Sequence, residues 1–394
     1  MPTPALPDAA LPAPREDLAG MEPYGAPQVE AAHLLNVNEN PVGPSPALVE
    51  DIAREVARAT AGLNRYPDRE FLDLRADLAA FLAEESGIPA PAPQEVWAAN
   101  GSNEVMHQLL LAYGGPGRTA LSFAPHYSMY PEYARDTLTS WRTAERGPAP
   151  DFTLSAQDVV TAIRRERLQI VLLTSPNNPT GTALDLDVVR AAAAELAADR
   201  GLLIVDEAYA EFRRDGVPSA LTLLGQHPNL VVSRTMSKAF ALAGARLGYM
   251  VADRRIVDTV RIVRLPYHLS AITQAVARAA LRHRRELLST VAMLRRERDA
   301  LAEHLRQRGH DVAPSDANFV LFTVRRDRHE VWQSLLDQGV LVREVGPPGW
   351  LRVSIGTPED NAAFRRALET ADPEPTAATA DDTTTATTPG REDA

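Results

Sequence analysis

Short apolar strands alternate with helical patterns through most of the chain, and this alternation restricts its fold more than any other feature. From Asn103 onward, apolar runs of strand length are separated by stretches in which apolar side chains recur every three or four residues. The predicted strands cover residues 119–123, 169–174, 202–205, 230–233 and 247–251. Strands that alternate with helices in this way form a mostly parallel sheet covered by helices. We therefore predict an α/β fold.

The remaining patterns predict a second, smaller domain. Amphipathic helices are expected at residues 46–61 and around residues 74–82, and residues 275–308 are helical in period with an arginine-rich polar face. Strands at 318–324, 340–343 and 350–355, with helices at 331–337 and ending near Thr370, predict an α+β layer. We predict an N-terminal arm (1–40), a large domain (41–274), a small domain (275–370) and a disordered tail (371–394), which lacks apolar periodicity.

Composition restricts the classes of partner and location. The formal net charge of -11 argues against general affinity for nucleic acids or anionic membranes, which require a basic surface. The chain has no cysteine, which excludes disulfides and thiolate metal sites. The proline-rich first twenty residues do not resemble a signal peptide, and no apolar run is long enough to span a bilayer. We expect a cytoplasmic enzyme that acts on small molecules.

The 41 basic side chains comprise 40 arginines and a single lysine, Lys238. Arginine stays protonated at any working pH, whereas an amine can lose its proton and attack a carbonyl carbon. A codon bias toward arginine would also remove lysine, so composition alone does not decide between chance and function. The neighbours of Lys238 favour function.

Four polar clusters lie at the ends of predicted strands, where an open α/β sheet places its ligands. A small-residue turn at 99–104 leads into a helix whose free N–H groups could hold a phosphate. A proline- and asparagine-rich turn occupies 175–181, and an apolar strand ends in acids within 205–209. Hydroxyls at 233–238 and an arginine at 244–246 surround the lysine and suit a phosphate dianion.

Each cluster also has an alternative explanation. An ordinary N-cap at Ser102 or Asn103 would account for the first, and a bare turn for the second. Asp206 could belong to a metal site, although no histidine or second acidic cluster accompanies it. We expect no metal.

Taken together, the clusters resemble the aspartate-aminotransferase-like, fold-type I family of pyridoxal phosphate enzymes over about residues 20–370. Within this family the chain is most similar to the histidinol-phosphate aminotransferases of the class II subgroup, particularly the actinobacterial ones. The motifs that carry this closer similarity are Leu35-Asn36-Val37-Asn38-Glu39-Asn40-Pro41, Asn64-Arg65-Tyr66-Pro67-Asp68, Ser315-Asp316-Ala317-Asn318-Phe319 and Trp350-Leu351-Arg352-Val353.

The resemblance implies pyridoxal 5'-phosphate as the cofactor and assigns it a site. Lys238 would form a Schiff base with it and act as the base, Asp206 would keep the pyridine nitrogen protonated, and Tyr209 would hydrogen-bond its phenolic oxygen. The other implied cofactor-binding residues are Ser102, Asn103, Tyr127, Asn178, Thr235, Ser237 and Arg246, with Tyr66 reaching in from the second subunit of a homodimer.

The resemblance further implies transfer of an amino group between L-histidinol phosphate and 2-oxoglutarate in histidine biosynthesis, by a ping-pong mechanism. The implied substrate-binding residues are Asn40, Tyr66, Asn178, Arg343 and Arg352. Some relatives have tyrosine where this chain has Asn40, and Arg343 alone could be an ordinary surface charge. An aromatic amino acid aminotransferase and a phosphothreonine decarboxylase are alternatives. A DNA-binding regulator on the same fold is disfavoured because the segment before Asn36 is short and not basic.

Overall fold

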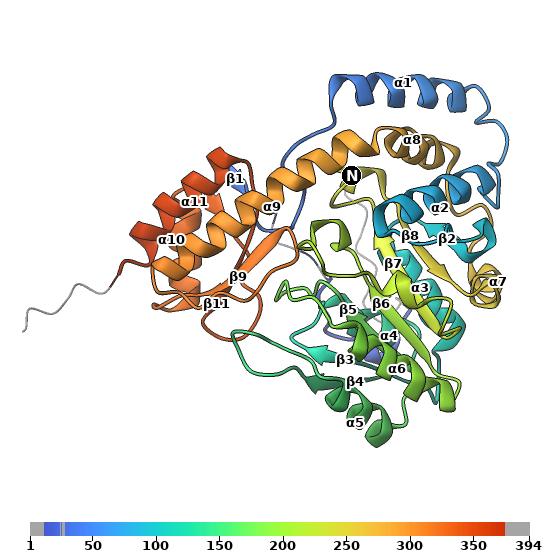
Figure 1. The fold of residues 1–394 in the computed structure, drawn as a ribbon, viewed down its shortest axis with the longest axis horizontal. Helices are drawn as coiled ribbons and strands as arrows, with labels where there is room; N and C mark the ends of the chain where they lie inside the picture. Colours follow the sequence, from blue (N-terminus) through green and yellow to red (C-terminus); the bar gives the residue numbers. More distant parts are fainter. Residues whose placement is uncertain (1–11, 24, 26–27, 375–394) are drawn as a thin grey trace, which may run out of the picture. The chain divides into compact units, whose positions relative to one another are not determined.

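The computed structural model describes residues 12–23, 25 and 28–374, and the chain divides into two units, Met1–Glu30 and Ala31–Ala394. The described part of the first unit contains one 3-10 helix, η2 (Glu16–Leu18). All elements discussed below belong to the second unit (Figure 1). Most of the predicted tail, residues 375–394, lies outside the described residues. Its first residues do not fit the prediction of disorder, because Asp372 is buried and accepts a hydrogen bond from the N–H of Arg325.

A seven-stranded sheet forms the centre of the larger part, in the order β2-β8-β7-β6-β5-β3-β4, and it contains the five strands that the sequence predicts. The strands are β2 (Val96–Ala99), β3 (Thr119–Ala124), β4 (Ser140–Glu145), β5 (Ile170–Thr174), β6 (Leu202–Asp206), β7 (Leu230–Thr235) and β8 (Gly248–Ala252). The pairs from β4 to β7 are parallel, whereas β8 is antiparallel to both β7 and β2. The sheet is therefore mixed and mostly parallel.

Burial explains which strands the sequence reveals. Every residue of β5, β6 and β7 is buried, as expected for parallel strands covered on both faces. The strands β5 and β6 read as apolar runs that end in one polar residue, whereas β7 is apolar only in its first half, Leu-Val-Val. The edge strand β4 has no buried residue, and its sequence, Ser-Trp-Arg-Thr-Ala-Glu, contains no apolar run. The sequence analysis missed β4 for this reason, and it also missed the four-residue strand β2.

Helices cover this sheet and connect its strands. Among them, α6 packs against β6 and α5, α3 packs against β2, β7 and β8, and α2 packs against β2 and α8. Short 3-10 helices η3 to η6 occupy Pro93–Glu95, Ala210–Phe212, Ala220–Leu223 and Ala243–Ala245. The helices of this part are α1 (Pro46–Thr60), α2 (Leu72–Ser86), α3 (Ser102–Tyr113), α4 (Met129–Asp136), α5 (Ala156–Glu166), α6 (Leu186–Ala198), α7 (Arg254–Val263) and α8 (Ala271–Arg282). No helix in the described part combines the length and apolar character needed to cross a membrane.

A smaller α+β layer follows, with two short sheets. The strand β9 (Phe319–Thr323) pairs antiparallel with β11 (Trp350–Ser354), while β1 (His33–Leu34) pairs parallel with β10 (Val340–Leu341). The helices α10 (Arg328–Asp337) and α11 (Pro358–Ala371) complete the layer. Because β1 pairs with β10, residues 35–45 are fixed at one end by the small layer and at the other by the start of α1.

The predicted continuous helical stretch at 275–308 is in fact two helices, α8 and α9 (Arg284–Gln307), separated at His283. The Nε2 atom of His283 lies 3.2 Å from Oδ2 of the buried Asp51 in α1, which anchors the break. The helix α8 packs against α1 and α2, whereas α9 reaches the small layer, where it contacts β9 and α11 (Figure 1). The division into domains remains our proposal, and these contacts favour a boundary at His283 instead of residue 274.

A buried ionic cluster fixes the ends of β6 and β7. The Arg234 guanidinium, in β7, donates to Glu207 at 2.9 Å, to Glu85 at 2.5 Å and to the Ser219 hydroxyl at 3.1 Å. The side chains of Arg234 and Glu207 are each 1% exposed. Glu211 lies 3.6 Å from the same guanidinium, and burial raises the pKa of Glu211 to about 7. Because side chains alternate along a strand, this cluster lies on the face opposite to Asp206.

We predict that Arg234→Ala lowers the free energy of unfolding by about 3 to 5 kcal/mol, because it leaves buried carboxylates without a cation. Urea unfolding followed by circular dichroism measures the change. The matched control is Arg164→Ala, which removes the exposed ion pair with Glu195 and should leave the unfolding midpoint nearly unchanged. Equal small effects of both changes would contradict the importance of the cluster.

Candidate active site

The carboxyl ends of β5, β6 and β7 are level with one another. Thr174 pairs in register with Asp206, and Asp206 pairs with Ser233. The polar turns that follow these strands therefore open onto the same region, which is where an open α/β sheet places its ligand. Most of the side chains predicted from the sequence collect there.

Lys238 lies in the turn after β7. Its Nζ donates a hydrogen bond to the carbonyl oxygen of Val37 at 3.0 Å. Burial, together with the cations of Arg352 and Arg246, lowers the pKa of the Lys238 amine to about 8, although Glu39 acts in the opposite direction. A larger fraction of this amine is neutral near pH 7 than of an ordinary lysine, so it can attack a carbonyl carbon.

Asp206 is the last residue of β6 and is buried. One carboxylate oxygen accepts a hydrogen bond from the Tyr130 hydroxyl at 3.0 Å, and the other accepts from the N–H of Ala208 at 3.2 Å. Burial raises the pKa of Asp206 to about 6, while these two donors oppose that change. Among the residues described, no group of three or more histidine, cysteine or acidic side chains could hold a metal ion.

Tyr209 receives hydrogen bonds from two distant segments. Its hydroxyl oxygen accepts from Nδ2 of Asn38 at 3.0 Å and from Nδ2 of Asn178 at 3.4 Å. Its ring packs edge-on against Phe319 of β9, with centroids 5.1 Å apart. The phenol is thus positioned by the larger part and the small layer together.

Backbone N–H groups, glycines and Arg246 form a cradle around the start of α3. The N-cap of this helix is Gly101, which has no side chain, so the predicted alternative of an N-cap at Ser102 or Asn103 is wrong. The N–H groups of Ser102 and Asn103 occupy the first turn, where a helix has no internal acceptors for them. A Cβ atom at Gly101, where φ is +90°, would lie 2.4 Å from Arg246 Nη2, and one at Gly248 would lie 2.0 Å from the nitrogen of Ser102. The neighbour of Gly248 is backbone, so only glycine permits that close approach, while at Gly101 the positive φ favours glycine.

Two hydroxyls line the other side of this cradle. Thr235 donates to the Ser237 hydroxyl at 3.0 Å, and the N–H of Ser237 donates back to Thr235 at 3.1 Å. The Arg246 guanidinium lies 3.5 Å from the Ser237 hydroxyl. Helix amides, hydroxyls and a guanidinium that converge in this way suit a phosphate dianion.

Arg352 brings a second guanidinium to the site from β11. It donates to Oδ1 of Asn178 at 2.6 Å and to the carbonyl oxygen of Asn36 at 2.8 Å, and it lies over the Phe319 ring. Its backbone forms a reciprocal pair with Arg343, with N–O distances of 3.0 and 2.9 Å. The two predicted substrate arginines are therefore cross-strand neighbours.

Three other predicted residues lie around this centre. Tyr127 is half-buried and packs edge-on against Tyr130 at 5.6 Å. The Asn40 amide donates to the carbonyl oxygen of Ala239 at 3.4 Å and its side-chain oxygen accepts from its own turn. Tyr66 is 79% exposed and stacks on Tyr267, with centroids 4.4 Å apart, so the described contacts do not bring it to Lys238 within this chain.

The structure adds site residues that the sequence analysis did not assign. Asn38 bonds Tyr209, and the carbonyl oxygens of Asn36 and Val37 bind Arg352 and Lys238. Tyr130 bonds Asp206. The sequence motif at 35–41, in which three asparagines follow one another closely, could have indicated Asn36, Val37 and Asn38 as site residues. A lone tyrosine at position 130 has no such motif around it.

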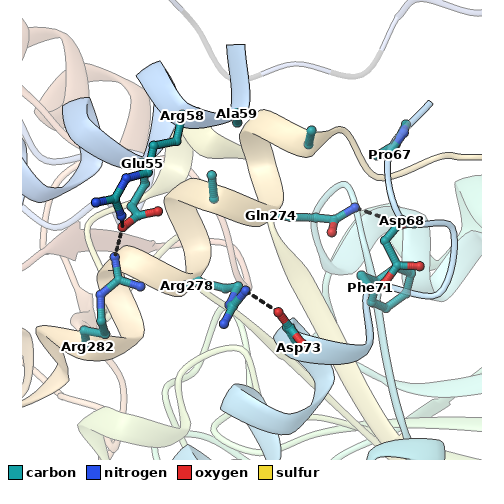
Figure 2. A pocket seen from close by; sticks show the side chains of 12 residues that line it. Glu55, Arg58, Ala59, Pro67, Asp68, Phe71, Asp73, Gln274, Arg278 and Arg282 are labelled. Atoms are coloured by element: carbon teal, nitrogen blue, oxygen red, sulfur yellow. Dashed lines mark hydrogen bonds and ion pairs between the residues drawn. The ribbon is translucent and has the colours of Figure 1, made fainter. Parts of the chain in front are cut away.

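A separate cavity of about 540 Å³ lies between α1, α8 and the loop before α2 (Figure 2). Its charged side chains neutralise one another: Arg282 pairs with Glu55 at 3.2 Å and Arg278 with Asp73 at 2.7 Å. None of the predicted site residues lines this cavity. Its paired charges do not favour an ion of either sign.

Comparisons with known proteins agree with this geometry. The family model for aminotransferase class I and II matches residues 32–368. The chain is 58% identical to the histidinol-phosphate aminotransferase of Thermobifida fusca, over 91% of this chain and 95% of that one. It is 55% identical to histidinol-phosphate aminotransferase 3 of Burkholderia lata, over 92% and 96%.

Solved structures show the same fold. The histidinol-phosphate aminotransferase of Sinorhizobium meliloti in complex with pyridoxal-5'-phosphate superimposes with a TM-score of 0.76 at 24% identity, covering 87% of this chain and 91% of that one. A mutant aspartate aminotransferase of Thermus thermophilus gives 0.76 at 25% identity, covering 91% and 98%. With a family model that spans most of the chain and relatives above 50% identity, the chain belongs to the histidinol-phosphate aminotransferases of the class I and II aminotransferase family.

Proposed function

We propose that the residues around Lys238 transfer an amino group between L-histidinol phosphate and 2-oxoglutarate, with pyridoxal 5'-phosphate as the cofactor. The reaction belongs to histidine biosynthesis and yields imidazole acetol phosphate and glutamate. The observation that carries this proposal is the position of the Arg352 guanidinium, close enough to Lys238 to lower the pKa of its amine. A fixed cation beside a reactive amine suits an amine substrate that carries an anionic group.

The residues present fit this cofactor. The cradle formed by the start of α3, Thr235, Ser237 and Arg246 would hold its phosphate, and the partly neutral Lys238 amine would bind its aldehyde carbon. When bound, the cofactor supplies an electron sink that makes a proton on the substrate's α-carbon removable. Tyr127 would contact the ring face, while Tyr209 and Asn178 would bond its phenolic oxygen.

Lys238 and Asp206 would then hold and move protons. The Nζ of Lys238, when it is not bonded to the cofactor, would accept the proton from the substrate α-carbon and hold it for return, so Lys238 would act as the base. Asp206 would keep a proton on the pyridine nitrogen, because a buried carboxylate whose hydrogen-bond donors are neutral groups is stabilised further by a cationic partner.

Arg352 and Arg343 would recognise the substrate anions. Histidinol phosphate has a phosphate and no carboxylate, whereas glutamate has two carboxylates, so the same guanidinium must accept both kinds of anion in turn. The planar fork of Arg352 matches either group, and Asn178 already orients it at 2.6 Å. Asn40 would assist from the turn beside Ala239.

A substrate screen tests the function directly. Each amine is mixed with the enzyme, and loss of the absorbance of the aldehyde form of the cofactor gives the rate of the first half-reaction. We expect kcat/KM for histidinol phosphate to exceed that for phenylalanine or tyrosine roughly tenfold or more, because the phosphate offers a second charge and more acceptor oxygens. Equal efficiency with the aromatic amino acids would favour an aromatic aminotransferase, and release of carbon dioxide from phosphothreonine would favour a decarboxylase.

Arg352→Ala should impair both half-reactions, since both substrates present an anion to the same group. We expect a loss of about 2 to 4 kcal/mol, or roughly thirtyfold to a thousandfold in kcat/KM for each. Lysine should rescue poorly because a point charge cannot reproduce the planar fork. The cross-strand neighbour provides the control: Arg343→Ala should act mainly on histidinol phosphate, and an equal effect of both changes on glutamate would contradict the assignment.

We also propose that the enzyme is a homodimer with shared sites. Three large side chains within residues 262–267 are exposed: Ile262 at 81%, Leu265 at 73% and Tyr267 at 38%. Tyr66, which stacks on Tyr267, is exposed at 79%. Exposed apolar side chains of this size favour burial against another surface. Tyr66 would then reach the cofactor phosphate of the partner. A cytoplasmic location remains a prediction from the sequence.

Subunit mixing tests the shared site. An inactive Lys238→Ala chain and an inactive Tyr66→Ala chain, mixed under conditions of verified exchange, should regain roughly a quarter of the parental activity, because half of the dimers are mixed and each has one site with both residues intact. Steady-state turnover of histidinol phosphate measures the recovery. If the mixture stays inactive, Tyr66 acts within its own chain or not at all.

A further inference from the structure

We propose that Tyr130 is a positioning residue for the reaction, which holds the Asp206 carboxylate in place and in its anionic form for the cofactor's pyridine nitrogen. The proposal rests on the role given to Asp206 above and assigns a function to a tyrosine outside the predicted site. It is carried by the contacts of the Tyr130 hydroxyl and by the packing that fixes the Tyr130 ring.

The hydroxyl of Tyr130 lies within hydrogen-bond distance of two side chains, Asp206 and Thr174. It lies 3.0 Å from Oδ2 of Asp206 and 2.8 Å from Oγ1 of Thr174. An ionised carboxylate can only accept, so the single phenolic proton points to Asp206. The Thr174 hydroxyl must then donate to the phenol oxygen. The protons are ordered from Thr174 through Tyr130 to Asp206.

This order strengthens the hold on the acid. A phenol that itself accepts a hydrogen bond is a better donor, because chains of hydrogen bonds polarise one another. The second carboxylate oxygen of Asp206 accepts from the N–H of Ala208, so each oxygen has a donor supplied by the protein. With both oxygens oriented, the carboxylate cannot rotate freely in its buried site.

The position of the Tyr130 ring is itself fixed. Tyr130 is fully buried, and its ring packs against His126 at 6.1 Å and edge-on against Tyr127 at 5.6 Å. It lies in the first turn of α4, which packs against β4 and α3. The same short segment thus carries Tyr127, which would contact the cofactor ring, and Tyr130, which bonds the acid that would pair with the ring nitrogen.

Electrostatics explains why such a donor is needed. Burial disfavours the charged form of Asp206, and the adjacent Glu207 adds repulsion. The Tyr130 hydrogen bond is the largest opposing effect, ahead of the Ala208 N–H. Without it, a neutral acid would become more common, and a neutral acid cannot stabilise a positive charge on the ring nitrogen.

The test compares two ligands of the apoprotein. One is pyridoxal 5'-phosphate and the other is its analogue in which carbon replaces the ring nitrogen, and equilibrium dialysis gives both dissociation constants. Both ligands have the aldehyde and the phosphate, and only pyridoxal 5'-phosphate has a ring nitrogen that Asp206 can bind. A difference between the two dissociation constants therefore reports the contact with Asp206. Tyr130→Phe should weaken binding of the first about tenfold, as expected for loss of a hydrogen bond to a charged group, and change binding of the analogue less than about twofold.

Two further variants make the test specific. In an Asp206→Asn background the additional Tyr130→Phe change should have no effect on either ligand, because the carboxylate that it serves is gone. Thr174→Val should weaken binding of pyridoxal 5'-phosphate in the same direction but less. The matched control is Tyr249→Phe, which removes the hydroxyl of an equally buried tyrosine that pairs in register with Arg234, and should change neither constant.

The outcomes separate this inference from the function itself. If Asp206→Asn abolishes the preference for the nitrogen-containing ligand while Tyr130→Phe leaves it intact, the role of Asp206 stands and the role of Tyr130 is overturned. Equal weakening of both ligands by Tyr130→Phe would show that the tyrosine only supports the fold. If the parent protein shows no preference between the ligands, the assignment of Asp206 fails and the inference fails with it.

Discussion

The level alignment of β5, β6 and β7 is the constraint on which the site depends. Thr174, Asp206 and Ser233 occupy matching positions on adjacent parallel strands, so whatever follows each strand must meet at one edge. The buried Arg234 cluster holds this alignment from the opposite face. Because side chains alternate along a strand, neighbouring residues at the same strand ends supply the support on one face and the chemistry on the other. A slip of one residue would exchange the two faces.

The surroundings of Lys238 and Asp206 differ in charge, and each favours the protonation state that its group needs. Cations gather near Lys238, where they favour a neutral amine. Asp206 accepts hydrogen bonds from one hydroxyl and one N–H group, which favour its anionic form without neutralising it. The amine must be uncharged to attack, whereas the acid must be charged to hold a proton on its partner. Each group therefore has its protonation state set by neighbours of the appropriate type.

The sequence predicts the parts of this structure that depend on local patterns or on scarce chemistry. Strands buried on both faces appear as apolar runs, and Lys238 and Asp206 are conspicuous as the sole lysine and as an acid that ends such a strand. The edge strand β4 could not be predicted because its exposed sequence contains no apolar run. The break at His283 could not be predicted because the helical period of the sequence continues across it. The contacts of Asn38 and Tyr130 depend on partners 171 and 76 residues away, and only the folded chain brings these together.

The single lysine also changes how the chain responds to agents that act on amines. Its only lysine side chain lies in a turn held to the carbonyl of Val37, and the arginines that cover the rest of the surface do not react with such agents. A protease that cuts after lysine has one bond to cleave, between Lys238 and Ala239, and in the folded chain that bond lies beside the site. Cleavage into two fragments would therefore report opening of the active site, without any label added to the protein.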